Sequence, residues 1–120
     1  MANSILTIVT KPPYGTEDAF AGFRLALSQI AGGAVEKSDV LIMEDGVFNA
    51  ISAQKSDMIG MPSNVEAIED LLGMECKVYC VKDDLDEREI TIDKTIDGIS
   101  IVLRDEVANI VDGYDVIASF

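Results

Sequence analysis

The feature that most constrains the fold of this chain is a regular alternation of short apolar runs with segments whose apolar residues recur at helical spacing. The short runs are rich in β-branched residues and apolar at almost every position, which is typical of strands buried on both faces of a parallel sheet. They occupy residues 5–9, 39–43, 76–81, 99–103 and 116–117. The sequence therefore predicts five strands.

The segments between these runs carry the end signals of helices. Thr16 and Ser63 are the predicted caps of the two clearest helices, and the glycines at 32–33 and 73 are their predicted stops. Further helical turns are expected over residues 47–53, 83–88 and, after a cap at Asp105, 106–111. Because such helices cover a parallel sheet on both sides, we predict a three-layer α/β/α fold around a central, mainly parallel five-stranded sheet, with residues 1–120 forming a single domain.

The charge of the chain limits its partners. Its 9 Lys and Arg against 22 Asp and Glu give a net charge of −13, which repels a phosphate backbone, so direct binding of nucleic acid is not expected. No apolar run reaches the roughly 20 residues that cross a bilayer, so no membrane association is expected. The first residues lack the basic start and the cleavage site of a signal peptide, and the expected location is the cytoplasm.

Two cysteines and no histidine leave few groups for chemistry. Cys76 and Cys80 share one predicted strand, where a rise of about 3.3 Å per residue separates their α-carbons by roughly 13 Å, too far for a disulfide between them. Their spacing also differs from the Cys-x-x-Cys motif of redox and zinc sites, and no histidine is present to complete a metal site. We expect neither a metal nor a cofactor.

Cys80 is placed near the carboxyl end of its strand, the edge of an open parallel sheet where ligands gather. We expect its sulfur to emerge at this rim, within reach of a neighbouring subunit. A helix N-terminus and Lys82 favour a thiolate there, whereas Asp83 and Asp84 oppose it. A reactive thiol and a small buried apolar side chain both remain compatible with Cys80, while for Cys76, at the opposite edge, the buried apolar role is preferred.

Three other segments have weaker functional signals. The loop at residues 11–16 precedes a helix N-terminus and suggests an anion cradle, but it has one glycine and no phosphate-binding fingerprint. The acidic run at residues 83–87 is more typical of a solvated helix face than of paired catalytic carboxylates. Residues 58–61 include two methionines, which suit either a protein interface or a cover over the domain's own core.

Four segments resemble sequence motifs of the TusC/DsrF proteins, in the family's order and over nearly the whole chain. They are Pro13-Tyr14-Gly15-Thr16, where the family has Pro-His-Gly-Thr; Asp45-Gly46-Val47-Phe48; Val78-Tyr79-Cys80-Val81 continuing to Leu85-x-Glu87-Arg88; and Tyr114-Asp115-Val116-Ile117-x-x-Phe120. Two positions depart from the pattern, since Tyr14 replaces a histidine and Glu89 stands where a glycine commonly follows Glu-Arg. The resemblance implies the DsrE-like three-layer α/β fold.

The resemblance also implies a function. TusC/DsrF proteins are subunits of complexes that pass persulfide sulfur between cysteines, toward tRNA 2-thiouridine synthesis in one branch and sulfur oxidation in the other. The chain is therefore expected to be a sulfur-carrier or sulfurtransferase subunit at most, in an oligomer with TusD/DsrE-like and TusB/DsrH-like subunits or with copies of itself. Cys80 corresponds in position to the cysteine that carries persulfide in the TusD/DsrE paralogues, and it is the candidate carrier; alternatively, it lines the passage that a partner's cysteine uses.

The other candidate site residues come from the loops at the same edge. As substrate-binding or interface residues we predict Tyr14, Gly15, Thr16, Asp45, Gly46, Phe48 and Lys82. Two alternatives to the sulfur relay stay open. One is a non-catalytic oligomeric scaffold, and the other is a small-ligand module that binds a nucleotide or a flavin at the loop of residues 14–16.

Overall fold

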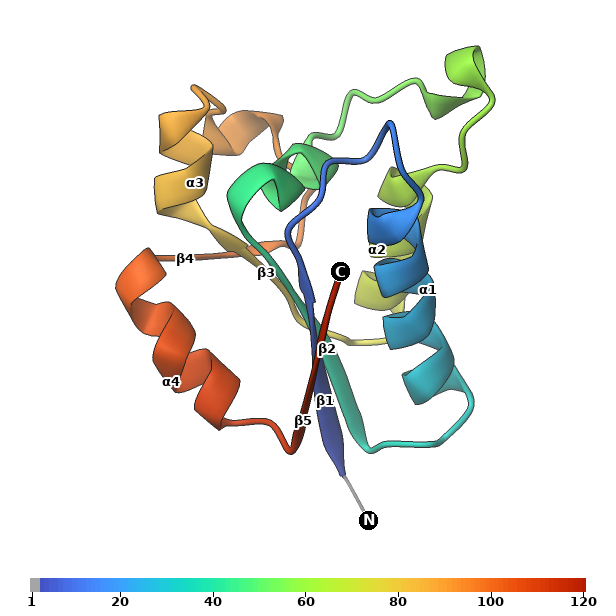
Figure 1. Cartoon of the computed structure of the whole chain (residues 1–120), viewed down its shortest axis with the longest axis vertical. Coiled ribbons are helices and arrows are strands. Elements are labelled where there is room, and N and C mark those ends of the chain that lie inside the picture. Colours follow the sequence, from blue (N-terminus) through green and yellow to red (C-terminus); the bar gives the residue numbers. More distant parts are fainter. Residues whose placement is uncertain (1–2) are drawn as a thin grey trace.

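Five strands form one sheet in the order β4-β3-β2-β1-β5 in the computed structural model of this chain, which describes residues 3–120 (Figure 1). Every pair of neighbouring strands is parallel, so all the carboxyl ends lie at one edge of the sheet; β1, β2 and β3 run toward the top of Figure 1. The predicted α/β fold with its parallel sheet is confirmed. The strand order, which an alternation of strands and helices does not fix, is now defined.

The helices, the 3-10 helices (η) and the strands have the following bounds. Along the chain they are β1 (Ser4–Val9), α1 (Asp18–Ala31), β2 (Lys37–Ile42), η1 (Glu44–Ala50), η2 (Ser56–Ile59), α2 (Asn64–Gly73), β3 (Val78–Val81), α3 (Lys82–Glu87), η3 (Ile92–Lys94), β4 (Ser100–Val102), η4 (Arg104–Glu106), α4 (Val107–Asp112) and β5 (Val116–Ser119). None of the helices within residues 3–120 is long and apolar enough to span a membrane.

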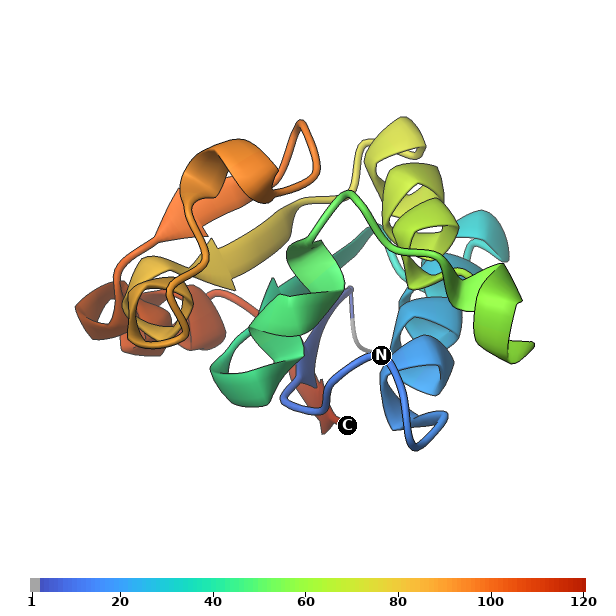
Figure 2. The same cartoon turned by 90° about the horizontal axis from the view of Figure 1, so that it is seen from above.

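The two faces of the sheet are covered to different extents. α1 and α2 pack side by side on one face, and α4 lies on the other (Figures 1 and 2). Successive strand residues point to opposite faces, so β2 sends Val40 and Ile42 to the α1 and α2 face and Leu41 to the α4 face. The buried cluster on the α1 and α2 face is much the larger of the two.

The ends of several elements differ from the expectations. The hydroxyl of Ser63 caps α2 as predicted, because it accepts from the backbone N–H of Glu66 at 3.2 Å. Thr16 does not cap α1, which begins at Asp18, because Gly15 at φ 97° turns the chain before the helix can start. Asp105 does not cap α4 either, since it lies inside the separate turn η4.

The predicted strand over residues 76–81 starts two residues later, at Val78. The N–H of Cys76 donates to the carbonyl of Leu71 at 3.0 Å, and that of Lys77 donates to Asp39 Oδ1 at 2.7 Å, so both residues belong to the turn that leaves α2. Met58, in η2, is 75% exposed, which rules out the interpretation that this segment covers the domain's own core.

Candidate functional site

The carboxyl edge of the sheet collects three of the predicted segments around the end of β3. The loop after β1, the helix η1 after β2 and the helix α3 after β3 all lie there (Figure 1). The side-chain amide of Asn49 in η1 donates to the carbonyl of Lys11 at 2.9 Å, which joins η1 to the first loop. η1 also packs against both β3 and α3, so it forms one side of a cover over the strand end.

Cys80 lies at the carboxyl end of β3, but its thiol is enclosed. Its side chain is completely buried in the apolar cluster that contains Val47 of η1 and Leu85 of α3. Burial, together with the nearby carboxylate of Asp84, raises the pKa of the Cys80 thiol from 9.0 to about 12. The expectation that this sulfur emerges at the rim is therefore wrong for the isolated chain, because η1 and α3 fill the space beyond the strand end.

Lys82 does not activate the thiol. Its ammonium forms an ion pair with Asp86 at 2.7 Å, one turn further along α3, and this contact raises the pKa of Lys82. The influences that shift the Cys80 thiol are burial and Asp84, and both raise its pKa. The helix start and the lysine thus do not offset burial, contrary to the direction that the sequence suggested for them.

Polar contacts hold η1 against α3. The Arg88 guanidinium donates to Asp45 Oδ1 from Nε at 3.1 Å and from Nη2 at 3.0 Å. The backbone N–H of Glu44 donates to Asp84 Oδ2 at 2.7 Å, and Glu44 takes a left-handed φ of 54° to do so. Asp45, predicted as a substrate or interface residue, thus forms an ion pair with Arg88, directly after α3. We call the Asp45–Arg88 pair together with the Glu44–Asp84 hydrogen bond the latch.

Asp84 also ties α3 to the segment after β4. Its Oδ1 accepts from Arg104 Nη2 at 2.5 Å, and the same guanidinium nitrogen donates to Glu87 Oε1 at 3.0 Å. Asp84 is only 3% exposed, so the interpretation of residues 83–87 as a solvated face is wrong at this position. Its role was missed because spacing alone does not show that Arg104, twenty residues later, returns to this helix. Arg88, by contrast, falls inside a motif quoted above, which marked its position.

Gly46 is required by close packing. A Cβ atom at this position would lie 2.1 Å from the carbonyl oxygen of Val9, a distance that no side chain can occupy. The Asp-Gly pair that opens η1 therefore allows the chain to cross directly over the end of β1. This gives Gly46 a role in positioning η1.

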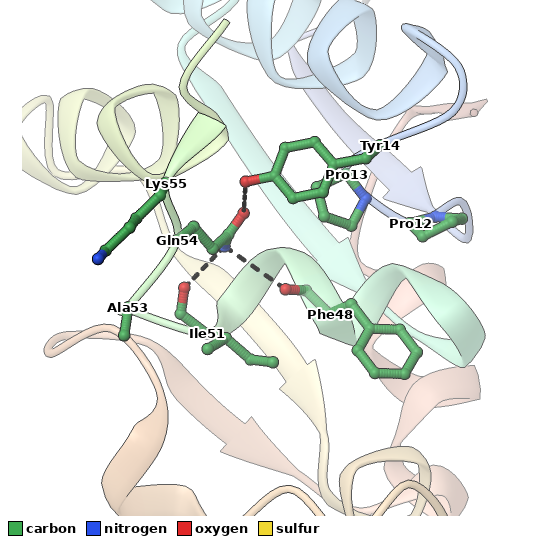
Figure 3. A pocket seen from close by; sticks show the side chains of 8 residues that line it. All are labelled: Pro12, Pro13, Tyr14, Phe48, Ile51, Ala53, Gln54 and Lys55. Carbon is green, nitrogen blue, oxygen red and sulfur yellow. Dashed lines mark hydrogen bonds between the residues drawn. The ribbon is translucent and has the colours of Figure 1, made fainter. Parts of the chain in front are cut away.

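Tyr14 and Phe48 come together in a pocket of about 400 Å³ at the same edge (Figure 3). The Tyr14 hydroxyl donates to Gln54 Oε1 at 3.0 Å, and the Gln54 amide in turn donates to the carbonyl of Ile51 at 2.7 Å. Gly15 and Thr16 are exposed and do not line this pocket. Gln54 was missed because it lies in a segment without periodicity.

No cluster of three or more His, Cys, Asp and Glu side chains suited to a metal ion occurs within residues 3–120. Both cysteines in this part of the chain are free and buried, and burial together with Asp39 raises the pKa of Cys76. Of the predicted residues, Cys80 lies at the end of β3 beneath η1, which contains Asp45 and Gly46, whereas Tyr14 and Phe48 line the neighbouring pocket.

Known proteins are similar to this chain in sequence and in fold. The model of the DsrE/DsrF-like family matches residues 3–120. An uncharacterized protein of Methanopyrus kandleri, MK0008, is 25% identical over 116 residues, which are 97% of this chain and 93% of that protein. The crystal structure of the ychN protein from E. coli has a TM-score of 0.87 at 26% identity and covers 98% of this chain and 99% of its own.

A protein of unknown function from Methanobacterium thermoautotrophicum, MTH1491, has a TM-score of 0.66 at 12% identity, with 96% of this chain and 97% of its own covered. At this identity the likeness concerns the fold alone. Together with the ychN structure it places the five-stranded parallel sheet among known architectures.

Proposed function

This chain belongs to the DsrE/DsrF-like family, and from that premise we propose that it is a cytoplasmic subunit of a sulfur-relay complex of the TusC/DsrF kind, with Cys80 as its sulfur-carrying residue. The observation that carries the proposal is the position of Cys80. It is the one cysteine of the described chain at the carboxyl edge of the sheet, directly before α3 and beneath the cover formed by η1 and α3.

The chemistry requires a thiolate and a donor persulfide. The Cys80 thiolate attacks the outer sulfur of a persulfide R–S–SH, so that a new S–S bond forms at Cys80 and the donor leaves as the thiolate R–S⁻. Cys80 then carries –S–SH, which a thiolate of the next subunit attacks in the same way. No other catalytic side chain is needed, since access and thiolate fraction set the rate.

Transfer requires the cover to open, because the enclosed thiol has a pKa of about 12 and no exposed surface. The construction of the cover supports such a movement. η1 and α3 contain seven and six residues, and the Asp45–Arg88 pair that joins them is partly exposed to solvent. Exposed ion pairs of this kind contribute only about 0.2–1 kcal/mol.

A second surface supports a role inside an oligomer. No residue of β5 is buried, although its Val116 and Ile117 are apolar and 41% and 40% exposed. β5 is an edge strand without a charged residue, and edges of this kind pair readily with another chain. We assign this face to a partner subunit, TusD/DsrE-like, TusB/DsrH-like or a copy of the chain.

Mass spectrometry of the native protein after incubation with glutathione persulfide tests the carrier role. Wild type and Cys76→Ser should gain one sulfur atom, located at Cys80, and Cys80→Ser should gain none. Equal sulfur gain in wild type and Cys80→Ser would exclude Cys80 as the carrier. A complete lack of sulfur gain in the isolated chain and in its purified complex would instead favour the non-catalytic scaffold.

Light scattering tests the oligomer separately. The wild type is expected to exceed the mass of one 12.9 kDa chain, alone or with its co-purified partners, and Ile117→Asp should reduce that mass. A wild-type protein that is strictly monomeric and co-purifies with nothing would contradict the assignment of this face.

A further inference from the structure

The pocket beside Tyr14 is a second feature of the carboxyl edge, and the sulfur relay does not use it. It lies between two walls, the loop at residues 12–14 and the segment from Phe48 to Lys55, and it has a volume of about 400 Å³ (Figure 3). Pockets that hold small ligands have volumes of about 300–1,000 Å³ and prefer this edge of a parallel sheet. The size and the place of the pocket are therefore those of a binding site.

Hydrogen bonds hold the two walls in place before any ligand arrives. The Tyr14 hydroxyl bonds to Gln54 at 3.0 Å, and Gln54 Nε2 donates to the carbonyls of Asn49 at 3.0 Å and Ile51 at 2.7 Å. Asn49, which is completely buried, also donates to the carbonyl of Lys11, behind the first wall. The pocket is thus preformed, and a ligand does not have to order it.

The lining determines which groups a ligand can use. Gln54 directs its amide hydrogens to carbonyls of its own segment, and the Tyr14 hydroxyl donates its hydrogen to Gln54. The remaining walls are two prolines, the ring of Phe48 and small apolar side chains. A ligand therefore needs a flat apolar body, since few polar groups are left to pair with it.

Lys55 is the one cationic side chain of this lining; it is exposed, and in Figure 3 its ammonium extends away from the rings of Tyr14 and Phe48. Figure 3 shows the ring of Phe48 on one side of Gln54 and the Lys55 ammonium on the other. Within residues 3–120 no carboxylate forms an ion pair with Lys55, although the chain has 22 acidic residues. An unpaired cation beside an apolar pocket favours a ligand with a negative group at one end.

The number of negative charges is limited by the rest of the chain. A net charge of −13 repels anions, and Glu17 and Asp18 stand where the first loop enters α1. A single lysine offsets one charge, whereas the phosphate of a flavin mononucleotide brings about 1.5 to 2 negative charges near neutral pH, and a nucleotide with several phosphates brings more. The pocket is thus better suited to a carboxylate than to a phosphate.

We propose that this pocket binds a small aromatic monocarboxylate, with its ring between Tyr14 and Phe48 and its carboxylate at Lys55. The inference is independent of the proposed sulfur transfer, because neither Cys80 nor the latch takes part in it. It replaces the nucleotide or flavin of the sequence-based alternative with a ligand of lower charge.

A titration followed by amide chemical shifts in two-dimensional NMR tests the proposal, with 2-naphthoate as the probe and neutral 2-naphthylmethanol as its matched analogue. Saturable shifts are expected at residues 12–14 and 48–55, with 2-naphthoate binding about 1.4 to 5 times more tightly, as one exposed charge pair predicts. Lys55→Met should abolish this preference. Lys77→Met, which removes an exposed lysine at the amino end of β3, should retain it.

Tyr14 provides the second pair of variants. Tyr14→Phe keeps the ring and should bind 2-naphthoate within about threefold of wild type, whereas Tyr14→Ala should weaken binding about tenfold, the cost of a lost aromatic contact. The proposal would be overturned by equal affinity of the wild type for the acid and the alcohol, or by an unchanged preference in Lys55→Met. It would also be overturned by chemical shift changes confined to other residues, or by tighter binding of FMN or ATP at this pocket. Since both Lys55→Met and Tyr14→Phe alter only the lining, they keep the test valid if Tyr14→Ala fails to fold.

Discussion

The latch between η1 and α3 predicts how often Cys80 becomes accessible. Asp45→Asn removes the charge that Arg88 holds while keeping the shape of the side chain. The two side chains are 62% and 23% exposed, and such pairs contribute about 0.2–1 kcal/mol. If η1 separates from α3 when Cys80 opens, that energy no longer opposes the opening, and labelling of Cys80 becomes about 1.4 to 5 times faster.

The assay uses a Cys76→Ser background, so that Cys80 is the thiol that reacts. Labelling with an aromatic disulfide reagent is followed by absorbance under native conditions, at a pH near the ordinary thiol pKa. Asp86→Asn is the matched control. It makes the same change at a carboxylate that is 58% exposed, but the partner of Asp86, Lys82, lies in the same helix, so this contact does not reach η1. The labelling rate of Asp86→Asn should therefore equal that of the Cys76→Ser protein.

Equal labelling rates in Asp45→Asn and Asp86→Asn would refute the idea that this pair closes the site. A Cys80 thiol that reacts in the native protein as fast as in the unfolded chain would refute the enclosure itself. Urea unfolding of the same variants separates local from global opening. Labelling that follows the global unfolding free energy in every variant would show that the cover does not open on its own.

Three further predictions concern stability. Gly46→Ala should lower the free energy of unfolding in urea by about 3 kcal/mol or more, because its Cβ would meet the Val9 carbonyl. Gly73→Ala, with open space around the new Cβ, should leave the free energy of unfolding unchanged or raise it by up to about 1 kcal/mol. Equal effects of the two substitutions would contradict the close approach at Gly46. Ser63→Ala should cost about 1 kcal/mol in the same assay through loss of the α2 cap, and an unchanged midpoint would argue against the cap. The folded-state pKa of Cys80, about 12, lies above the ordinary 9.0, so its protonated thiol stabilises the fold fully below pH 9 and progressively less above it. Between pH 9 and 12 the free energy of unfolding of the wild type should therefore fall by up to about 1.4 kcal/mol per pH unit more than that of Cys80→Ala. Parallel curves of unfolding free energy against pH would contradict the burial of the thiol.

The fold followed from the sequence because local pattern and burial agree in this chain. Runs such as residues 5–9 and 39–43 are apolar at nearly every position, and both became strands with helices on their two faces. Helix ends were predicted less well where a turn competes with the cap. Ser63 has no such competitor, whereas Gly15 redirects the chain before Thr16 can act as a cap.

The site followed from the sequence only in part. The carboxyl edge was correctly expected to gather the loops, because parallel strands all end there. The sequence left a buried and a reactive Cys80 open as alternatives, since the enclosure of its thiol depends on how η1 folds back over β1 at Gly46. The contacts of Asp84 with Glu44 and Arg104 join residues 40 and 20 positions apart, and no local pattern encodes such distances.

The enclosure of Cys80 is compatible with a carrier role if the open form supplies the thiolate. At neutral pH a thiol with a pKa of about 12 is ionised in roughly one molecule in 10⁵, whereas an exposed thiol with the ordinary pKa of 9.0 is ionised in about 1 of 100. The ratio, about 1,000, corresponds to about 4 kcal/mol. Any opening that costs less than this makes the open form the main source of thiolate.

Local openings span free energies from near zero to the global stability of about 5–15 kcal/mol. The cover over Cys80 is held in part by an exposed ion pair and in part by the buried residues Val47, Asp84 and Leu85, so its opening costs free energy within that range. A partner subunit that displaces η1 or α3 would therefore raise the reactivity of Cys80 by up to about 1,000-fold without changing any residue near the sulfur. Labelling of Cys80 in the isolated chain and in the complex measures this directly, and equal rates in the two would mean that the partner does not control access to the thiol.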